Sequence, residues 1–203
     1  MRPSAGLAAA LVAVAVTGSA VAVQVLTPTD PVVAGQLAAP VAAPSTEPGS
    51  TSAPSATAAR PVGLRIPAID VAARVVRLGL NPDRTVEVPS NPAETGWYRP
   101  GPAPGDAGSA VILGHVDSVD GPAVFDRLDE LRVGDRVAVD AADGSTAVFR
   151  VVRLVNYPND RFPAERVYAA PGGGRRLNLV TCSGPFDPED GYQANLVVYT
   201  RQV

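Results

Sequence analysis

The sequence contains no lysine, a single cysteine (Cys182) and a single histidine (His115) in 203 residues. One cysteine excludes an internal disulfide framework, and with only one histidine beside it an ordinary structural zinc site is excluded as well. The 17 basic residues are all Arg, and against 20 acidic ones they leave a formal charge of −3. Because no basic run occurs, the sequence does not predict the clustered cationic face that nucleic-acid binding needs, and no nucleic-acid partner is expected.

Charged residues are absent between Arg2 and Asp30, and residues 5–26 are almost wholly apolar. As a helix this run is about 33 Å long, enough to cross the hydrocarbon core of a bilayer. With Arg2 on the short side, the positive-inside rule predicts a single-pass protein of the cell membrane, with a cytoplasmic N-terminus and an extracellular remainder. A cleavable signal peptide is the alternative, because the small residues of AVA at 20–22 offer a cleavage site.

Aromatic residues are absent from residues 27–61, which hold seven Pro, many Ala, Ser and Thr, and only three charged residues. Such a segment buries too little apolar surface to offset its ordering entropy. We therefore expect three parts: a signal or transmembrane anchor at 1–26, a disordered Pro/Ala-rich linker at 27–61, and a folded domain at 62–203.

The pattern of residues 62–203 is mostly strand-like. Short β-type runs bounded by turn residues are predicted at 74–78, 85–88, 109–113, 136–140, 147–152, 177–181 and 196–199. The Asp-Gly pair at 143–144 predicts a hairpin, and apolar residues at helical spacing predict one short helix over 124–131. Seven or eight short strands in one domain favour a β-barrel or a β-sandwich.

Cys182 and His115 each follow an apolar strand and precede a turn. Two such strands can deliver both side chains to one rim, where an imidazole can activate a thiol. The plainer interpretation is that Cys182 is a small buried apolar residue and His115 a satisfied polar one. An unpaired thiol on an exported protein favours the catalytic interpretation, because it is an oxidation liability unless it has a use.

The segments around these two residues resemble a known family. Residues 110–117 (AVILGHVD) resemble the histidine block of sortases, and residues 179–184 (LVTCSG) resemble their cysteine strand. Other segments are similar to class F, a branch common in high-GC Gram-positive bacteria: RIPAIDV at 65–71, GWY at 96–98, GPAVF at 121–125, FD at 186–187 and NLVVY at 195–199. The resemblance covers residues 62–203.

This resemblance implies a closed, eight-stranded, mostly antiparallel barrel with one or two short helices. It also implies a transpeptidase. Because the sequence contains no ligand-dense loop, we expect no cofactor and no metal. Cys182 attacks a Leu-Pro-x-Thr-Gly-like sorting signal to form an acyl-thioester, and His115 acts as general acid and then as general base. The implied partners are secreted proteins with a C-terminal sorting signal and an amine acceptor of the cell wall.

One family residue is missing, because sortases usually carry an Arg on the strand that follows the cysteine. Here that strand reads YQANL at 192–196. We expect Asn195 to take the place of the Arg as a neutral hydrogen-bond donor, with Gln193, Arg201 and Arg161 as the other candidates. The missing Arg leaves two alternatives open: a cysteine hydrolase on the same scaffold, and a catalytically silent exported β-barrel that serves as a binding module.

Overall fold

The computed structural model describes residues 58–169 and 173–203. The predicted anchor at 1–26 lies outside these residues, and so does the predicted linker apart from its last four positions. Among the residues described, none of the helices has the length and hydropathy to span a bilayer.

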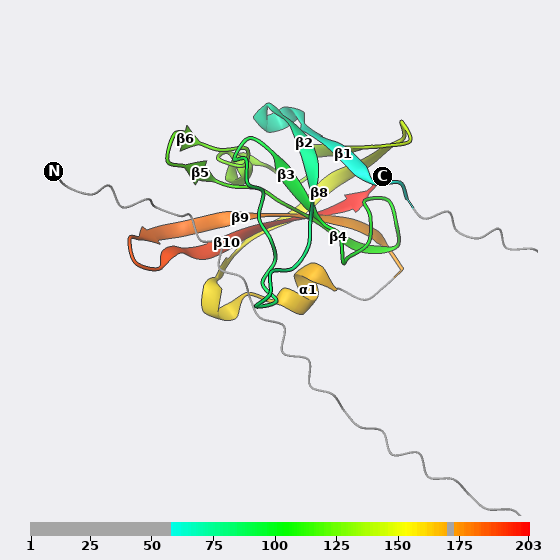
Figure 1. Cartoon of the computed structure of the whole chain (residues 1–203). Helices are drawn as coiled ribbons and strands as arrows, with labels where there is room; N and C mark the ends of the chain where they lie inside the picture. Colours follow the sequence, from blue (N-terminus) through cyan, green and yellow to red (C-terminus); the bar gives the residue numbers. More distant parts are fainter. Residues whose placement is uncertain (1–57, 170–172) are drawn as a thin grey trace, which may run out of the picture. The chain divides into compact units, whose positions relative to one another are not determined.

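Eight strands close into a barrel in the order β1-β2-β3-β4-β9-β10-β8-β7, with β7 pairing back onto β1 (Figure 1). They are β1 (Pro61–Ile66), β2 (Val71–Leu78), β3 (Thr95–Tyr98), β4 (Gly108–Leu113), β7 (Arg136–Ala141), β8 (Thr146–Pro158), β9 (Arg175–Asp187) and β10 (Gly191–Gln202). All neighbouring strands are antiparallel except the pairs β2–β3 and β4–β9, which are parallel. The predicted closed, mostly antiparallel barrel is confirmed.

Short elements connect the strands. They are η1 (Pro67–Ile69), the two-stranded hairpin β5 (Asp117–Ser118) and β6 (Gly121–Pro122), η2 (Leu128–Glu130), η3 (Asn159–Arg161) and α1 (Ala164–Tyr168).

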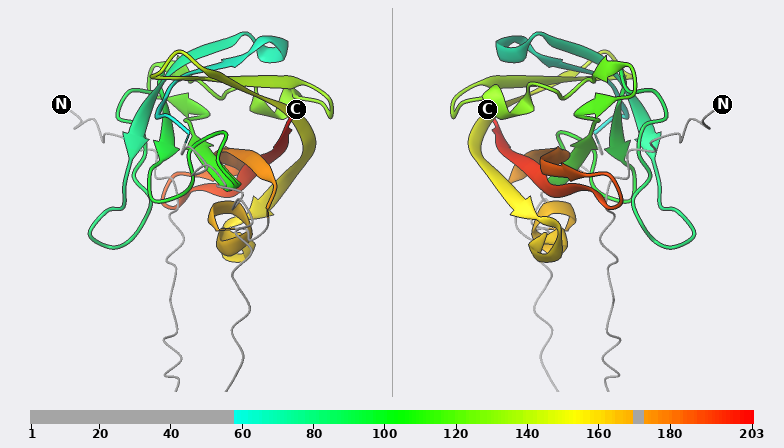
Figure 2. Two further views of the ribbon diagram at one scale, coloured as in Figure 1. Left: turned by 90° about the vertical axis from the view of Figure 1, so that its right-hand side faces the viewer. Right: turned by 90° about the vertical axis from the view of Figure 1, so that its left-hand side faces the viewer.

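Alternating side chains of β9 and β10 divide between two apolar clusters. Leu179 and Val198 belong to the cluster that fills the barrel, whereas Val180 and Val197 belong to a second cluster that also contains Val167 of α1. This is the alternation expected of a strand that is covered on both faces. Figure 2 shows α1 outside the barrel, beside β9 and β10. The outer face of these two strands is therefore partly covered, and the site described below lies on it.

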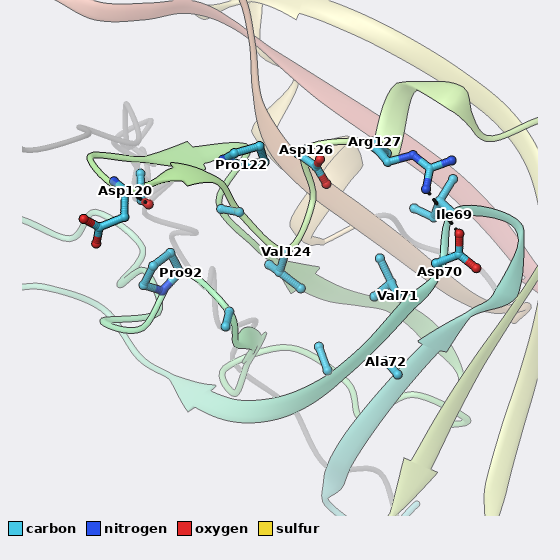
Figure 3. Close-up of a pocket in the computed structure, with 14 residues that line it drawn as sticks. Ile69, Asp70, Val71, Ala72, Pro92, Asp120, Pro122, Val124, Asp126 and Arg127 are labelled. Atoms are coloured by element: carbon cyan, nitrogen blue, oxygen red, sulfur yellow. Dashed lines mark hydrogen bonds and ion pairs between the residues drawn. The ribbon is translucent and has the colours of Figure 1, made fainter.

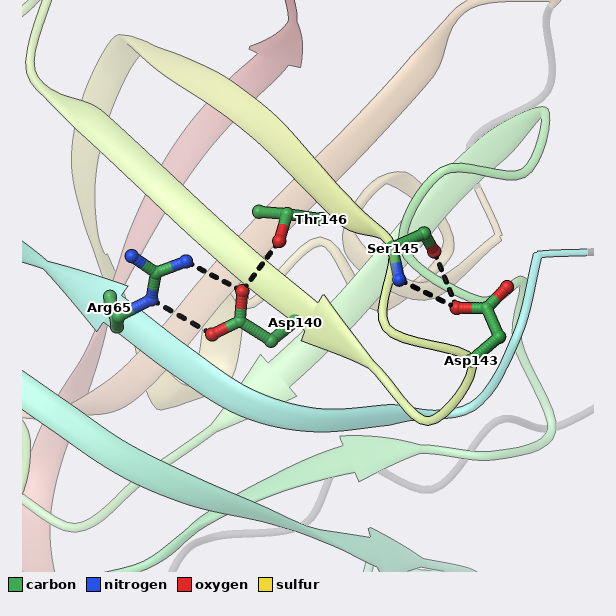
Figure 4. A network of polar contacts seen from close by, with 5 residues as sticks. All are labelled: Arg65, Asp140, Asp143, Ser145 and Thr146. Atoms are coloured by element: carbon green, nitrogen blue, oxygen red, sulfur yellow. Dashed lines mark hydrogen bonds and ion pairs between the residues drawn. The ribbon is translucent and has the colours of Figure 1, made fainter.

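Polar contacts close the barrel where β7 meets β1 (Figure 4). Arg65 of β1 donates two hydrogen bonds to the Asp140 carboxylate of β7, at 2.8 and 2.6 Å, and Thr146 Oγ1 donates to the same carboxylate at 2.7 Å. The hydrogen bonds from Arg65 hold the pKa of Asp140 below its usual value. In the next turn, Ser145 donates its backbone N–H and its Oγ to Asp143, so the hairpin predicted from the Asp-Gly pair is confirmed.

One sequence-based expectation is wrong, and the short helix expected over 124–131 is present only as the three-residue η2. Residues 85–88 form no strand: Leu80 and Val86 make one isolated bridge, and Thr85 turns back to bond Asp83 through its N–H and its Oγ1. Residues 124–131 form turns and the short η2 instead of an α-helix. The N–H groups of Val124 and Phe125, at the start of this segment, bond distant carbonyls of Pro92 and His115.

The α-helix of the structure, α1, was not predicted. It has only five residues, too few for its sequence to show a helical period.

Candidate active site

The parallel pairing of β4 with β9 brings His115 and Cys182 to the same edge. Leu113, the last residue of β4, pairs with Val180 of β9, and the next N–H along the chain, that of Gly114, donates to the Val180 carbonyl at 3.1 Å. Two residues beyond this pair stand His115 on one chain segment and Cys182 on the other. Parallel strands advance together, so His115 leaves the end of β4 beside the stretch of β9 that carries Cys182.

Cys182 is a free thiol with 7% of its surface exposed. Burial raises its pKa to about 12, and the nearby charge of Asp117 adds to the shift. At neutral pH the resting site therefore holds a neutral thiol.

Asn195 lies directly across from Cys182 in the β9–β10 pairing and is 4% exposed. Its Nδ2 donates to Asn159 Oδ1 at 2.9 Å, and Asn159 Nδ2 donates to the Tyr192 carbonyl at 2.7 Å. This chain of amides fixes the side chain of Asn195. An amide nitrogen carries two N–H donors, so one remains available beside the thiol.

The other three candidates for the missing Arg lie elsewhere. Gln193 is exposed and bonds the carbonyl of Gly191, close by on its own strand. Arg161 is 81% exposed and pairs with Asp160. Arg201 lies at the opposite end of β10, across from Arg176. Of the four candidates, Asn195 is the one that the register places opposite Cys182.

His115 is held by its ring and by its backbone. Its Nε2 lies 2.7 Å from the carbonyl oxygen of Pro89, and because a carbonyl only accepts, Nε2 is the donor. In the neutral ring Nδ1 is then the nitrogen free to accept a proton. The carbonyl of His115 also accepts the N–H of Phe125 at 2.9 Å.

Gly114 allows this close approach of the chain. A Cβ at Gly114 would stand 2.6 Å from Phe125 Cδ2 and 2.8 Å from Val124 Cγ1, closer than side chains tolerate. Phe125 is fully buried and has little room to yield. Glycine is therefore the residue that fits directly before the histidine.

A second polar pair flanks the thiol. The Tyr192 hydroxyl donates to Asp117 Oδ2 at 2.5 Å, and Asp117 is two residues beyond His115. This hydrogen bond raises the pKa of Tyr192 to about 12, with smaller contributions from burial and from the charges of Asp117 and Cys182. Asp117 is thus tied to the strand opposite the cysteine.

Directly after Cys182, β9 carries one more residue than β10 does. Ala194 pairs with Ser183 and Tyr192 with Phe186, and Gly184 between them adopts a φ of 79°. Such a bulge bends the strand and redirects the side chains next to it. The Ser-Gly pair at 183–184 is the sequence signal for this bulge, since glycine adopts positive φ without strain.

Sequence reasoning did not identify Asn159, Pro89 or the bond between Tyr192 and Asp117. Asn159 and Pro89 come from connecting segments, and Pro89 acts through its backbone carbonyl, which leaves no side-chain signal.

A separate hollow of about 540 Å³ lies between the start of β2 and residues 118–127 (Figure 3). Neither Cys182 nor His115 lines it. Asp70, Asp120 and Asp126 do, and Asp70 pairs with Arg127 at 3.3 Å. Within residues 58–169 and 173–203, no group of three or more His, Cys, Asp or Glu side chains is placed to hold a metal ion.

A scan against protein families matches the Sortase domain over residues 64–203, which is more than half of the chain. The chain therefore belongs to the sortase family, whose members are cysteine transpeptidases. No curated protein is similar enough to count as a match.

Solved structures of sortases share the fold. Sortase A from Corynebacterium diphtheriae matches at 20% identity and a TM-score of 0.54, over 71% of this chain and 61% of that one. Sortase C-1 from Actinomyces oris matches at 20% identity and a TM-score of 0.55, over 70% of this chain and 74% of that one. Sortase C from Streptococcus pneumoniae matches at 20% identity and a TM-score of 0.54, over 71% of this chain and 68% of that one. The chain thus spans about three fifths of the Corynebacterium diphtheriae chain.

Proposed function

We propose that the protein is a transpeptidase in which Cys182 cleaves a sorting signal and His115 moves the protons. The observation that supports this proposal is the parallel β4–β9 pairing, whose last residue pair, Leu113 with Val180, lies two residues before His115 on one segment and two before Cys182 on the other. Family membership supports the same reaction class.

The resting protonation states suggest the order of steps. Nδ1 of His115 takes the proton of the Cys182 thiol, and the thiolate attacks the peptide carbonyl to form a tetrahedral intermediate. When the C–N bond breaks, the leaving amine takes the proton back from His115, and the acyl group stays on Cys182 as a thioester. An incoming amine then gives a proton to His115 and attacks the thioester, which frees the thiolate.

Asn195 supplies the hydrogen bond that an Arg provides elsewhere in the family. In the proposed reaction its free Nδ2 donor faces the oxygen on which negative charge develops. A neutral amide stabilises that charge less than a guanidinium does.

The substrate, the subtype and the location belong to the same proposal. The sequence resemblance supports a class F sortase of Gram-positive bacteria that acts on Leu-Pro-x-Thr-Gly-like signals of secreted proteins and passes them to a cell-wall amine. The apolar run at 5–26 and the Pro-rich residues 27–61 support a domain tethered to the outer side of the cell membrane.

The test uses the full chain in non-ionic detergent with a Leu-Pro-x-Thr-Gly peptide library, with and without an added amine. Intact mass spectrometry should detect an acyl adduct that Cys182→Ala abolishes and that the amine discharges. Ser183→Ala is the matched control, because it removes a neighbouring, partly exposed side chain whose Oγ donates to Asn156 Oδ1. Discharge by water alone would favour the hydrolase. The absence of any adduct would favour the catalytically silent binding module.

A further inference from the structure

The other end of the same outer face carries a cluster of arginines. Four of them, Arg153, Arg166, Arg176 and Arg201, line a hollow of about 480 Å³ that also includes Tyr199 and Asn178. They come from β8, α1, β9 and β10, so residues far apart in sequence meet there. Among the residues that the structure describes, no acidic side chain lines the hollow.

The strand register extends this cluster into a row. Arg176 of β9 pairs with Arg201 of β10, Arg201 pairs with Arg150 of β8, and Arg150 pairs with Arg136 of β7. Neighbouring strands are about 4.8 Å apart, so the row is about 14 Å long. Like charges placed directly opposite one another destabilise a sheet.

Nothing in the part of the chain that the structure describes neutralises most of these charges. Arg136, Arg150, Arg153, Arg166 and Arg201 make no ion pair with a described carboxylate. The contacts they do make are to neutral groups: Arg150 donates to the Gly134 carbonyl, and Arg153 donates to the Tyr157 hydroxyl and lies over the Tyr199 ring. The nearby Asp135 accepts the N–H of Arg132.

We propose that this surface, the hollow together with the row, binds a linear phosphate polymer through its backbone charges. Guanidinium groups match phosphate oxygens with paired N–H donors. A single carboxylate would neutralise one cation, whereas the row presents a series of them along a line. A chain that carries a phosphate at each repeat fits such a line, with one end of the chain seated in the hollow.

The surface is distinct from the Cys182 site although it shares its face. Arg176 precedes Cys182 by six residues on β9, about 20 Å of extended strand. Between them Asn178 Nδ2 donates to the Val167 carbonyl, so α1 crosses the face at that point. A polymer held in the row would therefore lie about 20 Å from the thiol and leave its place free.

The test measures binding of fluorescently labelled inorganic polyphosphate to the full chain in non-ionic detergent, over a series of salt concentrations. The double variant Arg166→Gln/Arg201→Gln should weaken binding at least tenfold at low salt. It should also reduce the slope of log K against log salt by about 1.4, at roughly 0.7 for each phosphate of a flexible strand that is no longer neutralised. The matched control is Arg77→Gln/Arg84→Gln, which removes the same charge at exposed positions on β2 and in the segment after it.

Equal weakening in the control would overturn the proposal, because the binding would then follow net charge alone. If free orthophosphate bound as tightly as polyphosphate, the proposal that the ligand is a polymer would be overturned. Two more probes test other partners: single-stranded DNA that binds with a dependence on its bases would indicate a nucleic-acid site, and binding to anionic phospholipid vesicles but not to free polyphosphate would indicate a membrane surface. The assay contains no sorting-signal peptide, so its outcome is independent of the proposed transpeptidase.

Discussion

The two ends of the β9–β10 pair lie on one face of the barrel, but one end is buried and neutral whereas the other carries charged side chains. At one end Cys182 and Asn195 are almost fully buried, the thiol is neutral, and the amide is hydrogen-bonded. At the other end Arg176 and Arg201 stand opposite each other across the same two strands. Burial keeps the thiol at the first end neutral, whereas solvent exposure allows the charged arginines at the second end to lie opposite each other.

This difference has a general physical reason. A buried ion loses its hydration, so a thiol in such a place stays protonated until a partner takes the proton. An exposed guanidinium keeps its charge at any physiological pH and is available to bind an anion. The same pair of strands thus supports a reactive group that is switched on by proton transfer and a set of permanently charged groups.

The largest effect expected at the buried end is on the reactivity of Cys182. Its pKa of about 12, against about 8.5 for an unfolded thiol, predicts alkylation by iodoacetamide at pH 8 at least about 100-fold slower in the folded protein than in urea. The rate should keep rising beyond pH 9. A plateau near pH 8.5 in the folded protein would contradict the neutral, buried thiol.

The same shift predicts how stability depends on pH. Since the folded thiol has the higher pKa, its contribution to the free energy of unfolding is complete below about pH 8.5 and is lost as the pH rises toward about 12. Cys182→Ala should remove this part of the alkaline loss, as measured by urea unfolding between pH 8 and 10.

Asp117→Asn should speed alkylation of Cys182, because the Asp117 carboxylate contributes to the raised pKa of the thiol.

The next largest effect is expected at Gly114. Gly114→Ala forces a Cβ against Val124 and the buried Phe125, so the chain and His115 with it must shift. A displacement of about 1 Å costs about 100-fold in turnover, and we expect a loss of that size together with a lower Tm. Gly173→Ala is the control, because a Cβ there meets nothing within 4 Å. Native turnover and Tm in Gly114→Ala would show that the histidine does not depend on this contact.

Asn195→Ala is expected to have a smaller effect on catalysis. A dedicated oxyanion donor is worth about 100-fold or more in kcat, but this amide is neutral and shares its donors with Asn159, so we expect about tenfold. The loss should fall on kcat rather than on KM. Gln193→Ala, on the same strand but exposed, should leave both constants unchanged. A change confined to KM would assign Asn195 to substrate binding.

The fold could be predicted where strands carry their own signal. The apolar runs at 109–113, 177–181 and 196–199 are the centres of β4, β9 and β10, because buried strands read as continuous apolar sequence. β1, β3 and α1 were not predicted, since they are short and shaped by their neighbours. The strand expected at 85–88 found no partner in the sheet.

The site could be predicted only in part for a related reason. Cys182, His115 and Asn195 stand in strands or just beyond their ends. The register pairs Asn195 with Cys182, and its last β4–β9 pair lies two residues before His115 and Cys182. The groups that hold them, such as the Pro89 carbonyl and Asn159, lie in connecting segments whose course depends on the whole fold. The arginine cluster illustrates the same limit, because its members are spread from position 136 to 201 and form no basic run in the sequence.

The smallest effect, and the sharpest contrast in sign, is expected from single arginines. Arg65→Gln removes two hydrogen bonds to Asp140 at the β1–β7 seam and should lower Tm slightly. Arg201→Gln removes a charge that stands between Arg176 and Arg150 and should leave Tm unchanged or raise it. Both shifts should shrink at 1 M salt, where the Debye length is about 3 Å. If Arg201→Gln lowered Tm as Arg65→Gln does, the arginine row would be stabilising by itself and would need no anion to explain it.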